Sequence, residues 1–245
     1  MLQEMKNYTH FTEGACALFE RKSASSSNYS QKIGLIDGCP FVMQGIEALL
    51  NTLPVSLSVN NLSLRDHGCD SIFLDNNFDV VISGLFGAKS NILNGFISLD
   101  KIKRLNPDVR VIVVTQTKNK RLLDFLVNMG ADALISCDDS LDEMKRVMMC
   151  TLQNKGKRVC SQMIKVQLPR SRDKTITNIS PLTVREIKVI NAILNGYDLN
   201  RISQLAARSV KTISHYKRSA MRKLRVNSNA KMLHSIQILA GQRIE

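Results

Sequence analysis

Residues 209–226, SVKTISHYKRSAMRKLRV, combine side chains that could bind a polyanion. Basic residues recur at helical spacing in this stretch, and acidic residues are absent from it. Arginine binds guanine edges through two hydrogen bonds, while lysine and serine suit contacts with phosphates. A solvated basic helix face that binds nothing would have the same composition, so this stretch alone leaves both interpretations open.

The net charge is concentrated in the part of the chain that contains this stretch. The 245 residues carry a formal net charge of +13. Residues 165–245 hold 16 of the 34 lysines and arginines but 4 of the 21 aspartates and glutamates, which leaves +12 there and +1 in the first 164 residues. This asymmetry is typical of a domain that binds nucleic acid. A basic domain that is merely soluble is the alternative.

Other features of the composition exclude several classes of protein. No run of about 18 apolar residues exists, and the N-terminus lacks the pattern of a signal peptide, so we expect a cytoplasmic, nucleoid-associated protein without a membrane partner. The six cysteines are widely spaced and form no CxxC pair, which indicates free thiols rather than a zinc site or a disulfide framework. We expect no metal, no cofactor and no enzymatic activity.

The basic stretch lies in a segment that predicts four helices, over residues 180–245. The first spans 180–196, with Ser180 as N-cap and Pro181 at its first position. The others span 199–208, 209 to about 224, capped by Ser209, and 228–241, capped by Ser228. The second and third are joined by a tight turn and predict a helix-turn-helix. One face of the third is expected to pack on the first two, through the apolar residues Ile187, Ile190, Ile202, Leu205, Ile213, Ala220 and Leu224.

The N-terminal part predicts an α/β domain. Residues 1–30 read as a flexible extension, and 155–179 as a linker. Between them, over residues 31–154, apolar strands alternate with helices, which favours a doubly wound, five-stranded parallel sheet. The last of these helices, at 140–155, has Ser140 and Glu143 spaced as a capping box. The strands are expected at 32–37, 57–62, 78–86, 109–115 and 131–137, and the other helices at 39–53, 94–106 and 118–130.

The C-terminal segment resembles the LuxR/FixJ-type (GerE) DNA-binding domain. The resemblance rests on LTVRE at 182–186, Gly196, Ser209, Thr212–Ile213 and Lys223–Leu224. The sequence RSVKTIS at 208–214 is especially similar to the branch of the family that includes RcsB. One departure is Arg225, where the family usually has glycine.

The resemblance also implies roles for individual residues. Ser214, His215 and Arg218 would face bases in double-stranded DNA. Phosphates would be held by Lys211, Thr212, Lys217 and Arg222. The fourth helix would supply dimer contacts through Met232, Ile236 and Leu239.

In this family a phosphate-accepting receiver usually precedes the DNA-binding domain, and residues 31–154 resemble one. A working receiver needs an acidic pair for Mg²⁺, an acceptor Asp, a Ser/Thr and a Lys, each after a strand. Here Asp37 is the remaining member of the acidic pair, Gly38 stands in its second position, and Gly84 replaces the acceptor. Thr115 is kept, and Cys137 replaces the lysine. The resemblance therefore implies a pseudo-receiver that is neither phosphorylated nor dependent on Mg²⁺.

These residues favour a transcriptional regulator that acts as a heterodimer with an RcsB-type response regulator. Three alternatives remain. The protein could be a constitutive homodimer that needs no phosphorylation. It could be an adaptor that binds another protein and has only non-specific affinity for DNA. A small-molecule sensor in the N-terminal domain is the fourth interpretation, without a ligand motif to support it.

Overall fold

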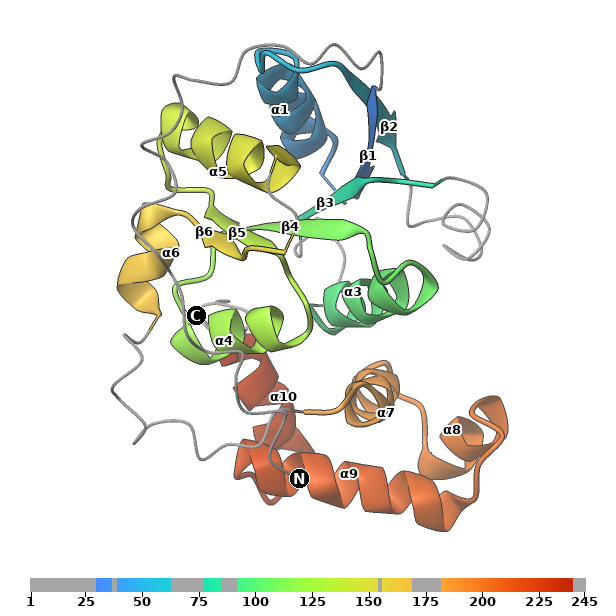
Figure 1. The fold of residues 1–245 in the computed structure, drawn as a ribbon. Helices are drawn as coiled ribbons and strands as arrows, with labels where there is room; N and C mark the ends of the chain where they lie inside the picture. Colours follow the sequence, from blue (N-terminus) through green and yellow to red (C-terminus); the bar gives the residue numbers. More distant parts are fainter. Residues whose placement is uncertain are drawn as a thin grey trace, which may run out of the picture.

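The described strands form one parallel sheet. The structure is a computed structural model that describes residues 30–36, 39–62, 77–84, 92–153, 156–168 and 182–239 (Figure 1). Its six strands run in the order β2-β1-β3-β4-β5-β6, and every neighbouring pair is parallel. They are β1 (Gln31–Ile36), β2 (Leu57–Asn61), β3 (Val80–Gly84), β4 (Arg110–Thr115), β5 (Ala133–Ser136) and β6 (Val159–Cys160).

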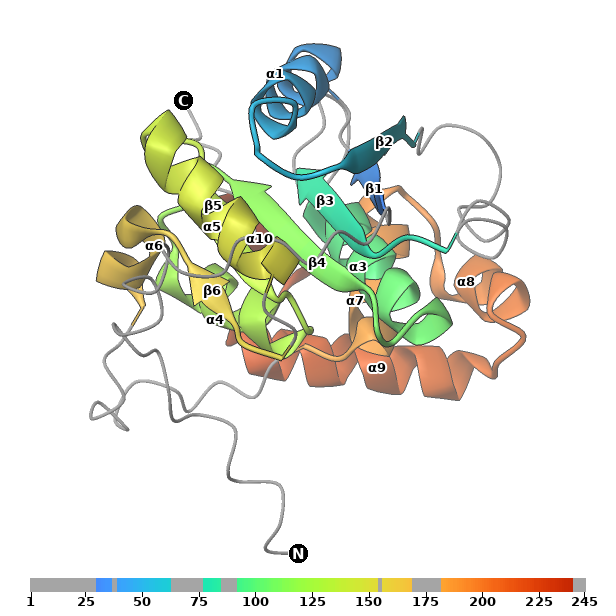
Figure 2. The same ribbon diagram turned by 45° about the horizontal axis from the view of Figure 1, so that its top comes forward.

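Helices cover both faces of the sheet because its central strands are apolar on both sides. Val80 and Ile82 pack on one face, and Val81 between them packs on the other. Helices α1 (Pro40–Leu50) and α5 (Leu141–Gln153) cover the first face, and α3 (Ile92–Leu105) and α4 (Lys120–Asn128) cover the second (Figures 1 and 2). The predicted doubly wound α/β architecture is confirmed.

The number of strands differs from the prediction, because the sheet has six strands and not five. The sixth, β6, lies at the start of the predicted linker, and α6 (Gln162–Gln167) follows it. β6 pairs with β5, and both Cys160 and Ile164 are buried. The six apolar residues of 156–168 fit no single strand or helix period among their polar and basic neighbours, which is why the sequence pattern missed this extension.

The junction between α5 and α6 also departs from the predicted capping box. Ser140 Oγ accepts a hydrogen bond from the Glu143 N–H at 3.3 Å, as a helix cap should. The Glu143 carboxylate, however, accepts two 2.6 Å bonds from Arg146 and one of 2.9 Å from the Gln162 N–H. Glu143 therefore connects α5 to α6 instead of closing a box.

The C-terminal part is all helical, as predicted. Its helices are α7 (Val184–Leu194), α8 (Leu199–Leu205), α9 (Val210–Leu224) and α10 (Asn229–Leu239). The predicted start of the first helix is wrong, because α7 begins at Val184 with Thr183 as N-cap. Thr183 and Glu186 form a reciprocal capping box, which satisfies two backbone donors and fixes the start there. Ser180 and Pro181 lie outside the described residues.

The helical part packs against the sheet domain through α7. Helix α7 contacts both α3 and α9, and it lies between them in both views (Figures 1 and 2). The apolar core on the α3 and α4 side of the sheet continues into this part: Leu99 and Ile102 of α3 belong to the same buried cluster as Ile187 and Ile190 of α7. In the part of the chain that the structure describes, no helix is long and apolar enough to cross a membrane.

Candidate nucleic-acid interface

One face of α9 is basic and open to solvent. Lys211, His215, Arg218 and Arg222 are all exposed, and their steps of four, three and four residues place them along one side of the helix. The other predicted contact residues, Thr212, Ser214 and Lys217, are half-buried beside this stripe. We call the four exposed residues the α9 basic face. It carries three cations and a histidine at helical spacing, as a helix that enters the major groove would need.

The opposite side of α9 holds the helix in place. Ile213 is buried against Val189 and Ile202, and Ala220 is buried in the same cluster as Ile187 and Ile190. These contacts confirm the predicted packing of α9 on the first two helices.

Leu205 is the exception to that packing. Its side chain is 63% exposed, so the prediction of a core position is wrong. Helix α8 has seven residues, and its buried positions are Ile202 and Ser203. In this short helix only these two positions face the core, and Leu205 faces solvent.

The N-terminal end of α9 is fixed by the predicted cap. Ser209 Oγ accepts a hydrogen bond from the Thr212 N–H at 3.1 Å and lies 2.8 Å from Thr212 Oγ1. In this arrangement the Thr212 hydroxyl bonds the cap, so its phosphate contact stays a prediction. The turn before the cap contains Ala207 with a φ of 48°, and it sets the angle between α8 and α9.

A buried ion pair locks α9 to α7. Lys223 Nζ lies 2.8 Å from Glu186 Oε2, and the side chains are only 16% and 4% exposed. Burial alone would raise the pKa of Glu186, but hydrogen bonds from Lys223, Thr183 and Ser219 outweigh it and lower the pKa. The sequence analysis missed this pair. The available signal was that Glu186 is the one acidic residue in 182–197.

Helix α9 ends in a left-handed residue. Arg225 has φ 56° and ψ 42°, and its N–H donates to the Arg222 carbonyl at 3.1 Å, while Val226 N–H donates to the Met221 carbonyl at 2.9 Å. Glycine adopts this conformation without steric cost, whereas a residue with a Cβ does not. The geometry explains why glycine would suit position 225.

Helix α10 turns its apolar side inward. Met232 and Ile236 are 0% and 3% exposed, in the same buried cluster as Ala220. In the protomer these side chains complete the core of the helical domain, and their role as dimer contacts stays a prediction. The side chain of Leu239 lies outside the described part of the chain.

Three residues of the predicted degenerate receiver site, Gly84, Thr115 and Cys137, lie at one edge of the sheet. Gly84 ends β3, Thr115 ends β4 and Cys137 follows β5; since the strands are parallel, these ends share an edge. Gly84 is paired with Val114, and the Cys137 N–H donates to the Thr115 carbonyl at 3.0 Å. Asp37 and Gly38 lie outside the described residues.

The three described residues themselves offer little of the chemistry of phosphoryl transfer. Gly84 has no side chain to accept a phosphoryl group. The Thr115 hydroxyl is buried and accepts a bond from the Thr117 N–H at 3.2 Å, and Cys137 is exposed. Within the described ranges, no three His, Cys, Asp or Glu residues are grouped as metal ligands would be.

Comparison with known proteins agrees with this architecture. Residues 180–236 match the family described as "Bacterial regulatory proteins, luxR family". The chain is 28% identical to the nitrate/nitrite response regulator protein homolog of Haemophilus influenzae, over 80% of this chain and 91% of that one. It is 25% identical to the transcriptional regulatory protein RcsB of Escherichia coli, over 82% and 91%.

Solved structures show the same fold. RcsB from Salmonella enterica serovar Typhimurium, bound to promoter P1flhDC with the phosphomimetic BeF3-, superposes with a TM-score of 0.57 at 18% identity, covering 86% of this chain and 100% of that one. A complex of the two-component response regulator RcsB with DNA gives 0.56 at 21% identity, covering 85% and 99%. These matched relatives are named as regulators and not as enzymes. The C-terminal part of this chain therefore belongs to the luxR family of bacterial regulatory proteins, and the chain as a whole is homologous to RcsB and to nitrate/nitrite response regulators.

Proposed function

We propose that this protein regulates transcription by binding specific DNA sequences through the α9 basic face, without phosphorylation of its receiver-like domain. The observation that carries the proposal is that face itself: Lys211, His215, Arg218 and Arg222 are exposed along one side of α9, while the other side is packed into the domain core. Arg218 and His215 would contact base edges, and Lys211 and Arg222 would contact phosphates. We further propose that it works in the cytoplasm, at the nucleoid.

Independence from phosphorylation follows from the residues at the edge of the sheet. Gly84 stands at the end of β3, where a receiver needs its acceptor carboxylate, and Cys137 stands after β5, where it needs a cation. Without a carboxylate nucleophile, no acyl phosphate forms at this position. We expect neither a mass increase of one phosphoryl group after incubation with acetyl phosphate and Mg²⁺, nor a spectral shift with a beryllofluoride salt. Modification of a peptide at this edge would contradict the proposal.

Because phosphorylation cannot drive dimer formation in this protein, a partner protein would have to do so. We propose an RcsB-type response regulator as this partner, with each protein binding one half-site. The first 164 residues carry a net charge of only +1, which suits a protein-binding domain better than a second DNA-binding surface. A homodimer that is always competent to bind is the second candidate, favoured by the exposure of the α9 basic face in the protomer.

The test is fluorescence anisotropy with a selected duplex and a scrambled duplex, across a salt series. The protein is measured alone and with an equimolar RcsB-type regulator. Sequence-selective binding that requires the partner supports the heterodimer, and equal selectivity without it supports the homodimer. A steep salt dependence with no preference between the duplexes would contradict specific binding, and would indicate an adaptor with non-specific affinity.

A further inference from the structure

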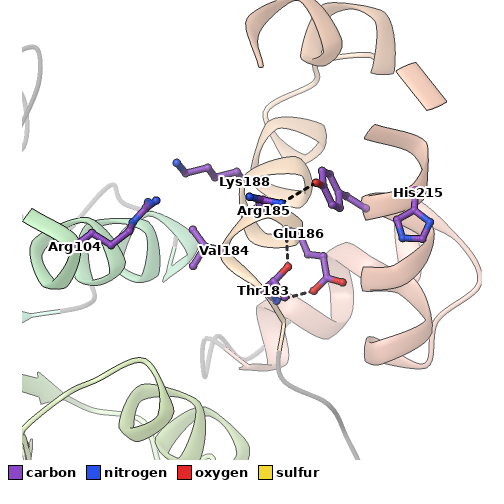
Figure 3. A pocket seen from close by; sticks show the side chains of 8 residues that line it. Arg104, Thr183, Val184, Arg185, Glu186, Lys188 and His215 are labelled. Carbon is purple, nitrogen blue, oxygen red and sulfur yellow. Dashed lines mark hydrogen bonds between the residues drawn. The ribbon is translucent and has the colours of Figure 1, made fainter. Parts of the chain in front are cut away.

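A groove with basic walls lies where the sheet domain meets the helical domain. It has a volume of about 500 Å³ and is bordered by α3, α7 and α9 (Figure 3). Figure 3 shows Arg104 on α3, beside α7, and Lys188 extending from α7 toward α3. The groove is therefore built from both domains: Arg104 comes from the sheet domain, and Arg185, Glu186, Lys188, His215 and Tyr216 come from the helical domain.

The charges on these walls do not balance. Arg104, Arg185 and Lys188 are all exposed, and each is a cation at neutral pH. Among the described residues of the lining, the one carboxylate is Glu186, which is buried and already paired with Lys223. Arg104 forms an ion pair with Asp100 on its own helix, but its side chain is still 63% exposed. Among the described residues, neither Arg185 nor Lys188 is paired with a carboxylate.

The groove continues the α9 basic face. His215 belongs to both: it is exposed in the stripe on α9, and it lines the groove. Next to it, Tyr216 accepts a hydrogen bond of 3.4 Å from Arg185, which holds that guanidinium beside α9. A polyanion seated on α9 could thus extend over α7 toward Arg104, past no exposed carboxylate among the described lining residues.

We propose that this groove binds backbone phosphates of the DNA that flanks the sequence read by α9, and that Arg104 makes the receiver-like domain part of the DNA-binding surface. The inference rests on the proposed function. It is specific to DNA because the groove is open and continuous with the α9 basic face, so it suits an extended chain of phosphates. One extra helical turn lengthens the duplex by about 34 Å along its axis, so its phosphates can reach beyond α9.

The experiment compares two duplexes with the full-length protein. Both carry a core of about 20 base pairs recovered by selection from a random library, and one adds about 10 base pairs of arbitrary sequence on each side. Affinity is measured by anisotropy from low to high salt for the wild type, Arg104→Gln and Lys188→Gln. Lys145→Gln is the matched control, because it removes a cation from α5 on the opposite face of the sheet. Thermal melts verify that each variant is folded.

Wild-type protein is expected to bind the extended duplex more tightly and with a steeper salt dependence than the core. Loss of one phosphate contact lowers the slope of log affinity against log salt by about one, or roughly five-fold in affinity at physiological salt. Arg104→Gln and Lys188→Gln should each show this loss on the extended duplex and keep wild-type affinity for the core. Lys145→Gln should match the wild type on both.

Two results would overturn the inference while leaving the proposed function intact: equal wild-type affinity for the core and extended duplexes, or an equal loss on both duplexes for Arg104→Gln. The second would mean that Arg104 acts through domain packing or through a small anion in the groove. If selection recovers no preferred core, either with the protein alone or with the RcsB-type partner present, the proposed function fails first, so the two failures are distinguishable.

Discussion

At the scale of single residues, Arg225 stands in a conformation that its own side chain disfavours. It closes α9 with a φ of 56°, where glycine has no steric penalty. Two backbone hydrogen bonds depend on this conformation, so the chain keeps it despite the cost. The guanidinium at this exposed position adds one more cation next to the α9 basic face.

Replacing Arg225 with glycine should therefore stabilise the protein. We expect Arg225→Gly to raise the free energy of unfolding by about 0.5–1 kcal/mol through relief of the backbone strain. The greater conformational entropy that glycine gives the unfolded chain offsets part of this gain. Urea denaturation measures this change in the free energy of unfolding. Arg208→Gly is the matched control, because Arg208 is exposed in the same domain without a positive φ, and it should give no gain. An unchanged or lower stability of Arg225→Gly would count against strain at this position.

Glu186 makes stability depend on pH in a defined direction. Its pKa is lower in the folded protein than the ordinary 4.5, because the bonds from Lys223, Thr183 and Ser219 outweigh the effect of burial. At a pH between the pKa of Glu186 in the folded protein and its pKa in the unfolded chain, the unfolded chain binds more protons. The stabilisation by the Glu186 carboxylate is therefore complete above about pH 4.5, and it is lost as the pH falls through the pKa of the folded protein. We expect Glu186→Gln to cost about 1–3 kcal/mol at pH 7, since it leaves Lys223 without its counter-ion.

The measurement is urea denaturation of wild type and Glu186→Gln from pH 7 down to pH 3. The difference between them should shrink as the solution becomes acidic. Asp198→Asn is a suitable comparison, since Asp198 caps α8 but has no ion-pair partner in the described structure. A difference that stays constant over this range would show that the charge of Glu186 contributes nothing.

At the scale of elements, α9 presents one side to the core and one to solvent. The exposed side carries His215 and Arg218, the proposed base contacts, near the middle of the helix, and the capped N-terminal end sets its position. We expect Arg218→Ala to cost about 1–3 kcal/mol on a selected duplex and to relax the preference at one base pair. Arg222→Ala should weaken binding to selected and scrambled duplexes alike, since a phosphate contact carries no sequence information.

Anisotropy with single-base variants of the selected site distinguishes these two effects. Lys145→Ala on α5 controls for the loss of one positive charge. If Arg218→Ala weakened all sequences equally, Arg218 would be a phosphate contact and not a reader of bases.

The elements that could be predicted are those with strong local signals. Ser209 and Ser228 cap α9 and α10 as expected, because a side-chain oxygen before an apolar period acts locally. The start of α7 was misplaced, since Ser180 and Thr183 are both good caps and the choice depends on Glu186. Helix α6 and the burial of Met232 could not be predicted, because they depend on contacts between segments distant in sequence.

At the scale of the whole molecule, the two domains share a core. Residues of α3 and α7 belong to one buried cluster, and an ion pair then joins α7 to α9. The position of the α9 basic face is thus fixed relative to the sheet. The edge of the sheet with Gly84 and Cys137 could be foreseen from the sequence because parallel strands bring their ends together, whereas the groove at α3 required the packing of two domains.

The open placement of α9 has a kinetic consequence. Its basic face is exposed while α7 is still packed on α3, so no separation of the two has to precede contact with DNA. Association would then be a simple second-order encounter. The observed rate would rise in proportion to DNA concentration without reaching a plateau, and salt would slow it by weakening the long-range attraction between the partners.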